Sequence, residues 1–197
     1  MSGGFYRALT TAHEYPLDEV ASALQKAVRR SQVDEALFWA AELNVSGYGA
    51  YCWRRLMVIA NEDIGLADSQ APILVWSLYS MSVEIRKAQP GPAAEKAARE
   101  WEPEALLHAT WYLARAPKNR ELPDAYSTIT LRMGGGERIQ VPDGALDGHT
   151  ARGRAMGRSE GFFQREGRKV EPEAVIRDNR WGAAWQAERP AAKDERP

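Results

Sequence analysis

The chain has 197 residues, enough for one hydrophobic core and an extension but too few for two full domains. Its 26 basic and 27 acidic side chains give a net charge of −1, so any attraction to nucleic acid or anionic lipid must be local. The single cysteine excludes an intrachain disulfide framework, the apolar runs are too short to span a bilayer, and the first residues lack the pattern of a signal peptide. We therefore expect a cytoplasmic protein.

Apolar residues recur at helical spacing through the first two thirds of the chain, which predicts an all-α fold. A first helix is expected behind Pro16, because proline suits the first turn of a helix. A second helix is expected from Ser31 to Leu43, since Ser31 and Asp34 resemble a capping box.

Four further helices are predicted: over residues 50–60, over residues 69–87, from about Pro103 onward, and over residues 121–133. The first of these is expected to end at the segment EDIG (residues 62–65), where Gly65 would supply a left-handed residue just past the helix. Asp68 is predicted to cap the helix that follows.

The composition changes after Met133. Nine of the sixteen glycines lie between Gly134 and Gly167, which argues for turns and an irregular segment that wraps around the helical part. The last residues are charged, contain proline and have almost no large apolar groups, so they are expected to be disordered. The predicted organisation is an N-terminal arm (1–14), a helical domain (15–133), a Gly/Arg-rich wrapping extension (134–186) and a disordered tail (187–197).

The acids of EDIG have a structural and a catalytic interpretation. Glu62 and Asp63 are expected to be surface acids in a last helical turn, where they oppose the helix dipole, so they should have cationic partners that fix how the helices pack. The candidate partners are Arg54 and Arg55 of the same helix, and Lys26, Arg29 and Arg30 of the first helix. In the alternative interpretation, Glu62, Asp63 and His108 serve a small metal-dependent hydrolase. We favour the structural interpretation, since the histidines are far apart in sequence and the lone cysteine completes no zinc pattern.

Four segments carry a resemblance to a known family. They are KAVRRSQVDEALFWAAEL (26–43), YCWRRLMVIANEDIGLAD (51–68), YLARAPKN (112–119) and VPDGAL (141–146). In order and separation they resemble the C-terminal domain of the MgsA/RarA family of AAA+ ATPases. That family is related to clamp loaders and to the Werner-helicase-interacting protein, and it acts at stalled replication forks.

The resemblance covers about residues 15–150 and implies a fold and a role. In the family, this helical region resembles the clamp-loader collar and holds subunits together as a tetramer. It therefore implies a collar-like helical bundle that forms a dimer or tetramer, or that docks on a separately encoded AAA+ ATPase or replication protein. The residues it places in this interaction motif are Arg54, Arg55, Glu62, Asp63, Gly65, Asp68, Pro117 and Lys118.

The sequence lacks the phosphate-binding loop that the ATPase part of the family requires. Gly134 to Gly136 lack the Lys-Ser/Thr pair of such a loop and are interpreted as a turn. The family's "PKSN" turn reads Pro117-Lys118-Asn119-Arg120 here, which keeps the positive charge without the serine. We expect a stand-alone module that is not an enzyme and has no catalytic residue, cofactor or metal.

A basic segment in the extension supports an alternative function, that of a DNA-binding protein. The candidate DNA contacts are Arg152, Arg154, Arg158, Phe162 and Phe163, because arginines track phosphates and aromatic rings stack on bases. Glycines at every fourth position, 153, 157 and 161, would on one helix allow close packing on the helical body, and we favour this interpretation, with the arginines pairing with acids or a partner. Trp181 and Trp185 are predicted to form an amphipathic anchor.

Overall fold

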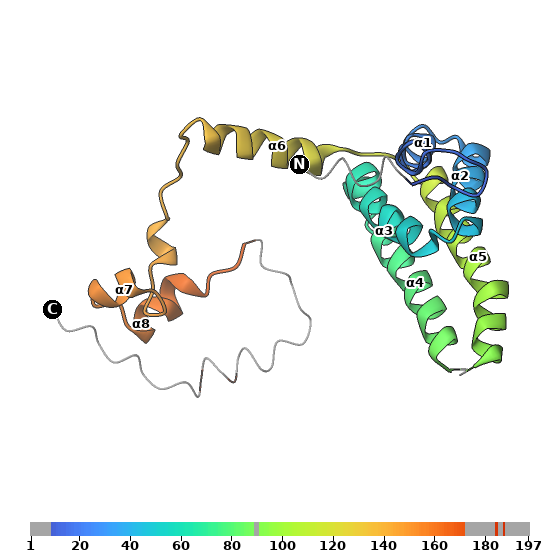
Figure 1. Cartoon of the computed structure of the whole chain (residues 1–197). Helices are drawn as coiled ribbons and strands as arrows, with labels where there is room; N and C mark the ends of the chain where they lie inside the picture. The colour runs from blue at the N-terminus through green and yellow to red at the C-terminus, as the bar shows by residue number, and fades with distance from the viewer. Residues whose placement is uncertain (1–8, 89–90, 172–183, 185–186, 188–197) are drawn as a thin grey trace. The chain divides into compact units, whose positions relative to one another are not determined.

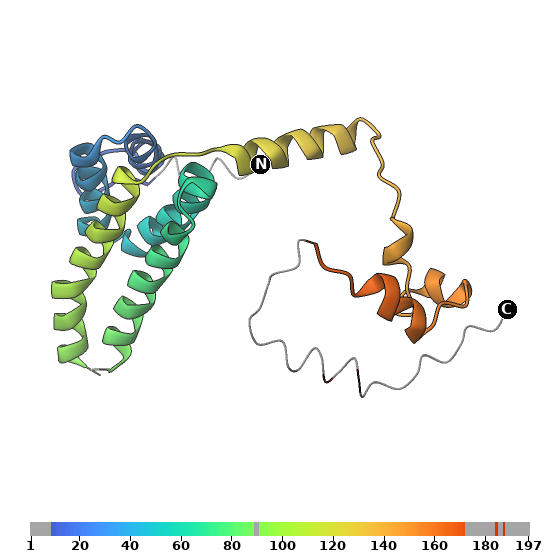
Figure 2. The same ribbon diagram turned by 180° about the vertical axis from the view of Figure 1, so that it is seen from behind.

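The computed structural model describes residues 9–88 and 91–171 and two isolated residues, 184 and 187; the side chains of residues 88 and 93–101 are outside this description. The chain forms two compact units, residues 1–135 and 136–197, which are treated separately below (Figures 1 and 2). Apart from one isolated bridge between Thr10 and Pro16, all regular structure of the described residues is helical. This confirms the predicted all-α fold, whereas the likeness to a clamp-loader collar stays a prediction. Trp181, Trp185 and most of both predicted terminal segments lie outside the described residues.

The first unit is a bundle of helices. Its elements are α1 (Leu17–Arg29), α2 (Val33–Val45), α3 (Gly49–Ile59), a π-helical turn η2 (Ala60–Ile64), a 3-10 turn η3 (Gly65–Ala67), α4 (Gln70–Ala88), α5 (Pro92–Arg115) and α6 (Glu121–Gly134). The long helices α4 and α5 run antiparallel side by side in both views (Figures 1 and 2). The helices predicted behind Pro16, over residues 50–60, over residues 69–87 and over residues 121–133 are all present.

Two helix starts differ from the predictions. α5 begins at Pro92, and Pro103 lies inside it. Proline in a helix interior removes a hydrogen bond and usually ends or kinks the helix, but here the packing of α5 along α4, with an ion pair between Arg86 and Glu102, outweighs that local preference.

Ser31 is the second difference, because it ends α1 rather than starting α2. Its φ is 56°, its N–H donates to the Val28 carbonyl, and the Gln32 N–H donates to the Ala27 carbonyl. This pair of bonds is a Schellman motif, which satisfies carbonyls at the end of a helix. Gln32 is the N-cap of α2 and its side chain makes no capping bond, so the predicted capping box of Ser31 and Asp34 is wrong.

The core of the first unit consists of apolar stripes on α1 to α5. The α1 stripe follows helical periodicity, so its members point inward together. Burying each large side chain contributes about 1.5–3 kcal/mol. Fully buried members of the core include Leu17, Leu24, Leu43, Leu56, Ile59, Ile64, Leu106 and Leu113.

The second unit consists of short helical turns: η4 (Asp143–Ala145), α7 (Ala151–Ala155), α8 (Glu160–Phe162) and η5 (Phe163–Gly167). Gly153 packs against the chain ahead of α7 so closely that a Cβ would lie 1.9 Å from the Asp147 carbonyl oxygen. α7 ends before Gly157, whose φ is 74°, and Gly161 lies in α8. The interpretation of the three glycines as one helical stripe is therefore wrong, because a left-handed turn interrupts the helix.

Candidate functional site

Asp63 is the centre of a network that we call the acidic hub, made of Glu62 and Asp63 with Gln25, Arg29 and Arg120. The Asp63 side chain is 0% exposed, so the expectation that it lies at the surface is wrong. Its carboxylate accepts hydrogen bonds from Arg29 Nε at 2.5 Å, Gln25 Nε2 at 2.9 Å and Arg120 Nη1 at 3.1 Å. Two arginines and an amide thus compensate a carboxylate that would be very costly to bury alone.

Glu62 completes the hub from a half-buried position. Its carboxylate accepts from Arg120 Nη1 at 3.1 Å and Gln25 Nε2 at 3.2 Å, and lies 3.6 Å from Arg29 Nη2. The hydrogen bonds to Glu62 and Asp63 raise the pKa of the Arg120 guanidinium above its ordinary value. The hub therefore ties α1, η2 and the start of α6 together.

The candidate partners of the acids have different outcomes. Arg29 is confirmed as a partner from α1. Arg55 contacts the acids only indirectly, because its Nη2 donates to Oε1 of Gln25, which binds both acids. Lys26 donates to Ser22 instead, and Arg30 and Arg54 are exposed. Gln25 and Arg120 were not among the candidates, although Arg120 directly follows the Pro117-Lys118-Asn119 turn.

The backbone of EDIG receives the loop that precedes α6. The Asn119 N–H donates to the Asp63 carbonyl at 2.9 Å. Gly65 has φ 51° and ψ −124°, so the predicted positive φ is confirmed, in a conformation that glycine tolerates and other residues do not. A Cβ on Gly65 would lie 3.2 Å from the Asn119 carbonyl oxygen. Both the acids and the glycine thus hold the same loop.

Lys118 secures the other end of this loop, directly after Pro117. Its Nζ donates to the carbonyls of Leu113 and Ala114, each at 3.1 Å, and to that of Ala116. These carbonyls belong to the last turn of α5 and the residue after it, where a cation is favoured. Burial lowers the pKa of Lys118.

Asp68 fixes the start of α4 against α5. Its Oδ1 accepts from the Gln70 N–H at 3.0 Å, which confirms the predicted cap. Its Oδ2 accepts from the Tyr112 hydroxyl at 2.6 Å, and this bond raises the pKa of Tyr112. The segments 51–68 and 112–119, which carry the family resemblance, therefore meet in space.

The hub geometry favours the structural interpretation of the acids. No oxygen of the buried Asp63 side chain is open to a substrate, and His108 is exposed on α5 without a hydrogen bond to either acid. Among the residues that the structure describes, no group of three or more His, Cys, Asp or Glu is placed to hold a metal ion.

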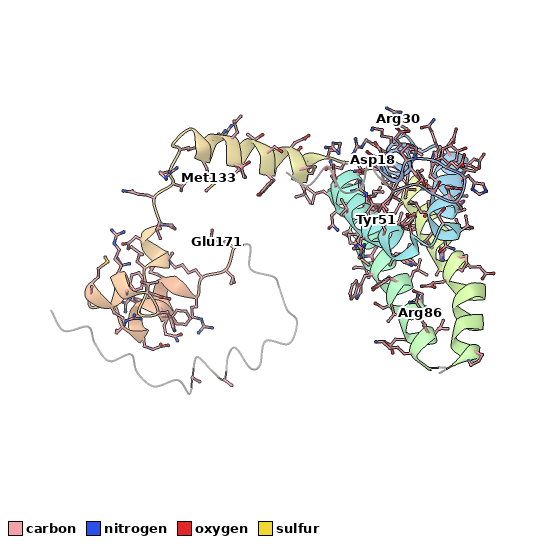
Figure 3. All side chains as sticks on the ribbon, in the orientation of Figure 1. Asp18, Arg30, Tyr51, Arg86, Met133 and Glu171 are labelled. Carbon is pink, nitrogen blue, oxygen red and sulfur yellow. The ribbon has the colours of Figure 1, made fainter. Side chains whose placement is uncertain are left out.

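Helix α6, which the hub anchors, has no buried residue. Four apolar side chains, at spacings of four, three and four, form what we call the α6 stripe: Leu122, Tyr126, Ile129 and Met133, which are 46%, 72%, 55% and 57% exposed. Figure 3 shows side chains standing out along this helix up to the labelled Met133. The spacing is that of the contact positions of a coiled coil, a signal that the sequence carried and that our site predictions missed.

A groove of about 500 Å³ lies beside the first half of the stripe. It is lined by Met57, Val58, Asn61, Glu62, Leu122, Pro123 and Tyr126. Most of these side chains are apolar, so the groove and the stripe form one continuous apolar surface within the first unit.

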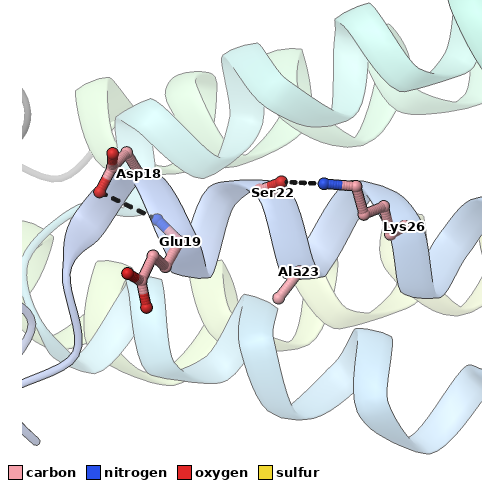
Figure 4. A pocket seen from close by; sticks show the side chains of 5 residues that line it. All are labelled: Asp18, Glu19, Ser22, Ala23 and Lys26. Atoms are coloured by element: carbon pink, nitrogen blue, oxygen red, sulfur yellow. Dashed lines mark hydrogen bonds between the residues drawn. The ribbon is translucent and has the colours of Figure 1, made fainter. Parts of the chain in front are cut away.

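Another hollow, of about 430 Å³, lies on α1 (Figure 4). All five residues that line it belong to this one helix, and its polar groups bond to neighbours on the same helix: Lys26 Nζ to Ser22 Oγ at 2.5 Å and the Glu19 N–H to Asp18 Oδ1 at 3.1 Å. It has no converging groups from a second element, so we assign it no site.

The candidate DNA contacts lie in the second unit. Arg158 pairs with Asp143 at 2.5 Å, in line with the prediction that arginines of this segment pair with acids. Its guanidinium carbon lies 4.1 Å from the centre of the Phe162 ring. Arg154 and Phe163 line a cavity together with Arg158, whereas Arg152 does not. Contact of this segment with the helical body stays a prediction.

In the described part of the chain, no helix is both long and apolar enough to cross a membrane.

Comparison with known proteins gives a consistent result. The family described as MgsA AAA+ ATPase C terminal matches residues 30–171. The chain is 34% identical over 148 residues to an uncharacterized AAA domain-containing protein of Mycobacterium tuberculosis, covering 73% of this chain and 29% of that protein. It is 35% identical over 114 residues to replication-associated recombination protein A of Haemophilus influenzae (56% and 22%) and 32% identical over 143 residues to that of Bacillus subtilis (71% and 30%). The chain thus spans less than a third of the length of these relatives.

Proposed function

Since the chain belongs to the MgsA/RarA family as a C-terminal domain of its AAA+ ATPases, we propose that it is a non-catalytic assembly module of DNA replication or repair that joins subunits through the α6 stripe. Two of the relatives are named replication-associated recombination protein A, which supports the process. A cytoplasmic location goes with that role.

The observation that carries this proposal is the contrast between how α6 is held and what it exposes. Arg120 and Lys118 fix the loop that leads into α6 with five side-chain hydrogen bonds, two from Arg120 to the acids of the hub and three from Lys118 to backbone carbonyls. The helix itself buries no side chain within the described residues. Because the loop before α6 is fixed in this way, the apolar face of the helix is preorganised for binding before a partner arrives.

We propose that the partner that covers the stripe is a second copy of this chain. A coiled-coil spacing on one helix is complementary to the same spacing on another, and the adjoining groove extends the surface that a copy would cover. Four side chains alone stabilise an interface by several kcal/mol at most, which association costs would largely cancel. The groove must therefore take part, and a dimer or tetramer follows.

An AAA+ ATPase is the second partner in this proposal. The matching relative of Mycobacterium tuberculosis is named an AAA domain-containing protein, and about 70% of its length lies outside the match. We assign ATP hydrolysis to such a partner and no reaction to this chain.

The stripe offers a matched pair of variants on one helix. Ile129→Asp places a charge in the stripe, whereas Leu131→Asp places it two residues on, about half a turn around the helix and outside the stripe, where the leucine is 78% exposed. Sedimentation velocity at tens of micromolar should show an oligomer for the unmodified chain and for Leu131→Asp, and a monomer for Ile129→Asp.

A monomeric unmodified chain would defeat the homo-oligomer and leave only the ATPase as a partner. Equal dissociation by both variants would remove the stripe from the interface.

A further inference from the structure

A cavity of about 350 Å³ in the second unit has the features of a binding site for a phosphate group. It is lined by Gly148, His149, Arg154, Arg158, Ser159, Glu160 and Phe163. These residues come from the turns before α7, from α7 itself and from the segment through α8 into η5. Several elements therefore converge on it, unlike the hollow on α1.

Arg158 holds together the chain segments that surround this cavity. Arg158 donates through Nη1 to the carbonyls of Asp143 and Leu146, at 2.6 and 2.9 Å, and through Nη2 to the Asp143 carboxylate at 2.5 Å. Its side chain is only 13% exposed. Arg158 thus orders the chain around the cavity, and its own charge is balanced by Asp143.

The other arginine retains donors for a ligand. Arg154 Nη1 donates to the carbonyls of Gly148 and His149, at 3.2 and 3.0 Å, which holds the guanidinium at the cavity edge. Within the described residues its Nε and Nη2 have no hydrogen-bond partner. A guanidinium has five N–H donors in a planar fork that matches the oxygens of a phosphate.

Ser159 gives an independent indication of a ligand. It precedes α8, yet its side chain does not cap that helix. Its hydroxyl oxygen is buried and has no hydrogen-bond partner among the described residues. An unsatisfied buried hydroxyl is costly, and rotation about a single bond lets it meet a ligand oxygen in the cavity that it lines.

The other members of the lining define the class of ligand. The His149 and Phe163 rings lie edge to face, with centroids 5.2 Å apart, and line the cavity together with the charged groups. The acids nearby have partners: Asp143 binds Arg158, Asp147 binds His149, and Glu160 accepts a bond from Gln164. Between Gly148 and Lys169 the chain has six basic and two acidic residues, although its net charge is −1.

We propose that this cavity binds the phosphate group of a nucleotide, with Arg154 and Ser159 as direct ligands and Phe163 beside the sugar or base. The inference does not depend on the assembly role of α6, because every residue it uses lies in the second unit. The phosphate has two sources, a free nucleotide or a nucleic-acid strand, and the test distinguishes them.

The test measures binding of three probes to the full chain at low salt: inorganic phosphate, AMP, and a fluorescent oligothymidylate of about eight nucleotides. Arg154→Gln should weaken binding of the probe that binds best by about tenfold. The matched control is Arg152→Gln, which removes the same charge from the same helix outside the cavity and should cost less than about threefold. Because Arg154 also holds two carbonyls, Ser159→Ala serves as a second variant and should cost about threefold with an unchanged melting temperature.

Binding of AMP as tightly as the oligonucleotide assigns a free nucleotide to the site, and a preference for the oligonucleotide assigns a strand. Equal losses in Arg152→Gln and Arg154→Gln would overturn the proposal in favour of diffuse attraction. So would unchanged affinity in Ser159→Ala and Arg154→Gln, or the absence of binding by all three probes.

Discussion

The acidic hub and α6 meet at Arg120, the residue directly before the helix, yet the two regions differ in what they bury. In the hub a buried carboxylate has three side-chain partners, and Gly65 beside the hub adopts a conformation that other residues avoid. In α6 no side chain is buried and four large apolar groups face outward along one stripe. The segments that carry the family resemblance thus support the exposed surface, and four of their residues, Met57, Val58, Asn61 and Glu62, also line the groove beside it.

The largest effect on stability is expected in the hub. Asp63→Asn removes the charge that compensates Arg29 and Arg120 with little change in shape, so it should lower the free energy of unfolding by about 3 kcal/mol. Urea denaturation measures this change. Glu104→Gln, which neutralises an exposed acid in α5, is the control and should stay within about 0.5 kcal/mol. Equal, small changes in both variants would mean that the hub does not stabilise the fold.

Gly65→Ala should have the next largest effect. The positive φ is strained for alanine, and the new Cβ would press on the Asn119 carbonyl oxygen, so we expect a loss of about 2 kcal/mol. Gly134 at the end of α6 has open space around it, and Gly134→Ala should be neutral or stabilise by about 0.5 kcal/mol. Similar melting temperatures for both alanine variants would contradict this account of EDIG.

Lys118→Met should cost about 1 kcal/mol, because it removes the cation from the last carbonyls of α5. The effect should depend on pH with a defined sign. Burial lowers the folded-state pKa of Lys118 below its ordinary value of 10.5, so between these two pKa values the unfolded chain binds more protons. The stability of the unmodified chain relative to Lys118→Met should therefore rise with pH in that window. A difference that falls with pH there would show that burial is not the dominant influence on Lys118.

The smallest effect on the folding of the single chain is expected in α6 itself. Ile129→Asp replaces a 55% exposed side chain, so under conditions where both proteins are monomeric its free energy of unfolding should change by no more than about 0.5 kcal/mol. A loss of 2 kcal/mol or more in dilute solution, on the order expected for a core position, would mean that the stripe packs within its own chain.

Local features of the sequence predicted most of the helices. Periodicity located α1, α3, α4 and α6, but Pro103 misled the prediction of α5, because packing along α4 outweighs a local helix breaker. Ser31 shows the same limit at a smaller scale, since a cap pattern does not reveal which of two adjacent helix ends a residue serves.

The candidate site was predictable only in part. The helix-dipole argument required cationic partners for Glu62 and Asp63, and Arg29 was among the candidates. Gln25 lies 37 residues from Glu62, and Arg120 lies 57 residues from Asp63, so no spacing rule connects them to the acids. The α6 stripe, by contrast, could have been predicted, because the apolar residues between positions 122 and 133 follow its spacing in the sequence.

The most direct test of the central claim measures whether the α6 stripe is covered when the chain assembles. A cysteine placed at position 129 or at position 131 reports on the stripe or on the opposite face. The native thiol does not interfere, because burial keeps Cys52 away from solvent and raises its pKa to about 12. On going from nanomolar to tens of micromolar protein, thiol labelling of Ile129→Cys should slow by about tenfold while that of Leu131→Cys stays constant. Labelling of Ile129→Cys that is equally fast at both concentrations would contradict the claim that a second copy covers α6.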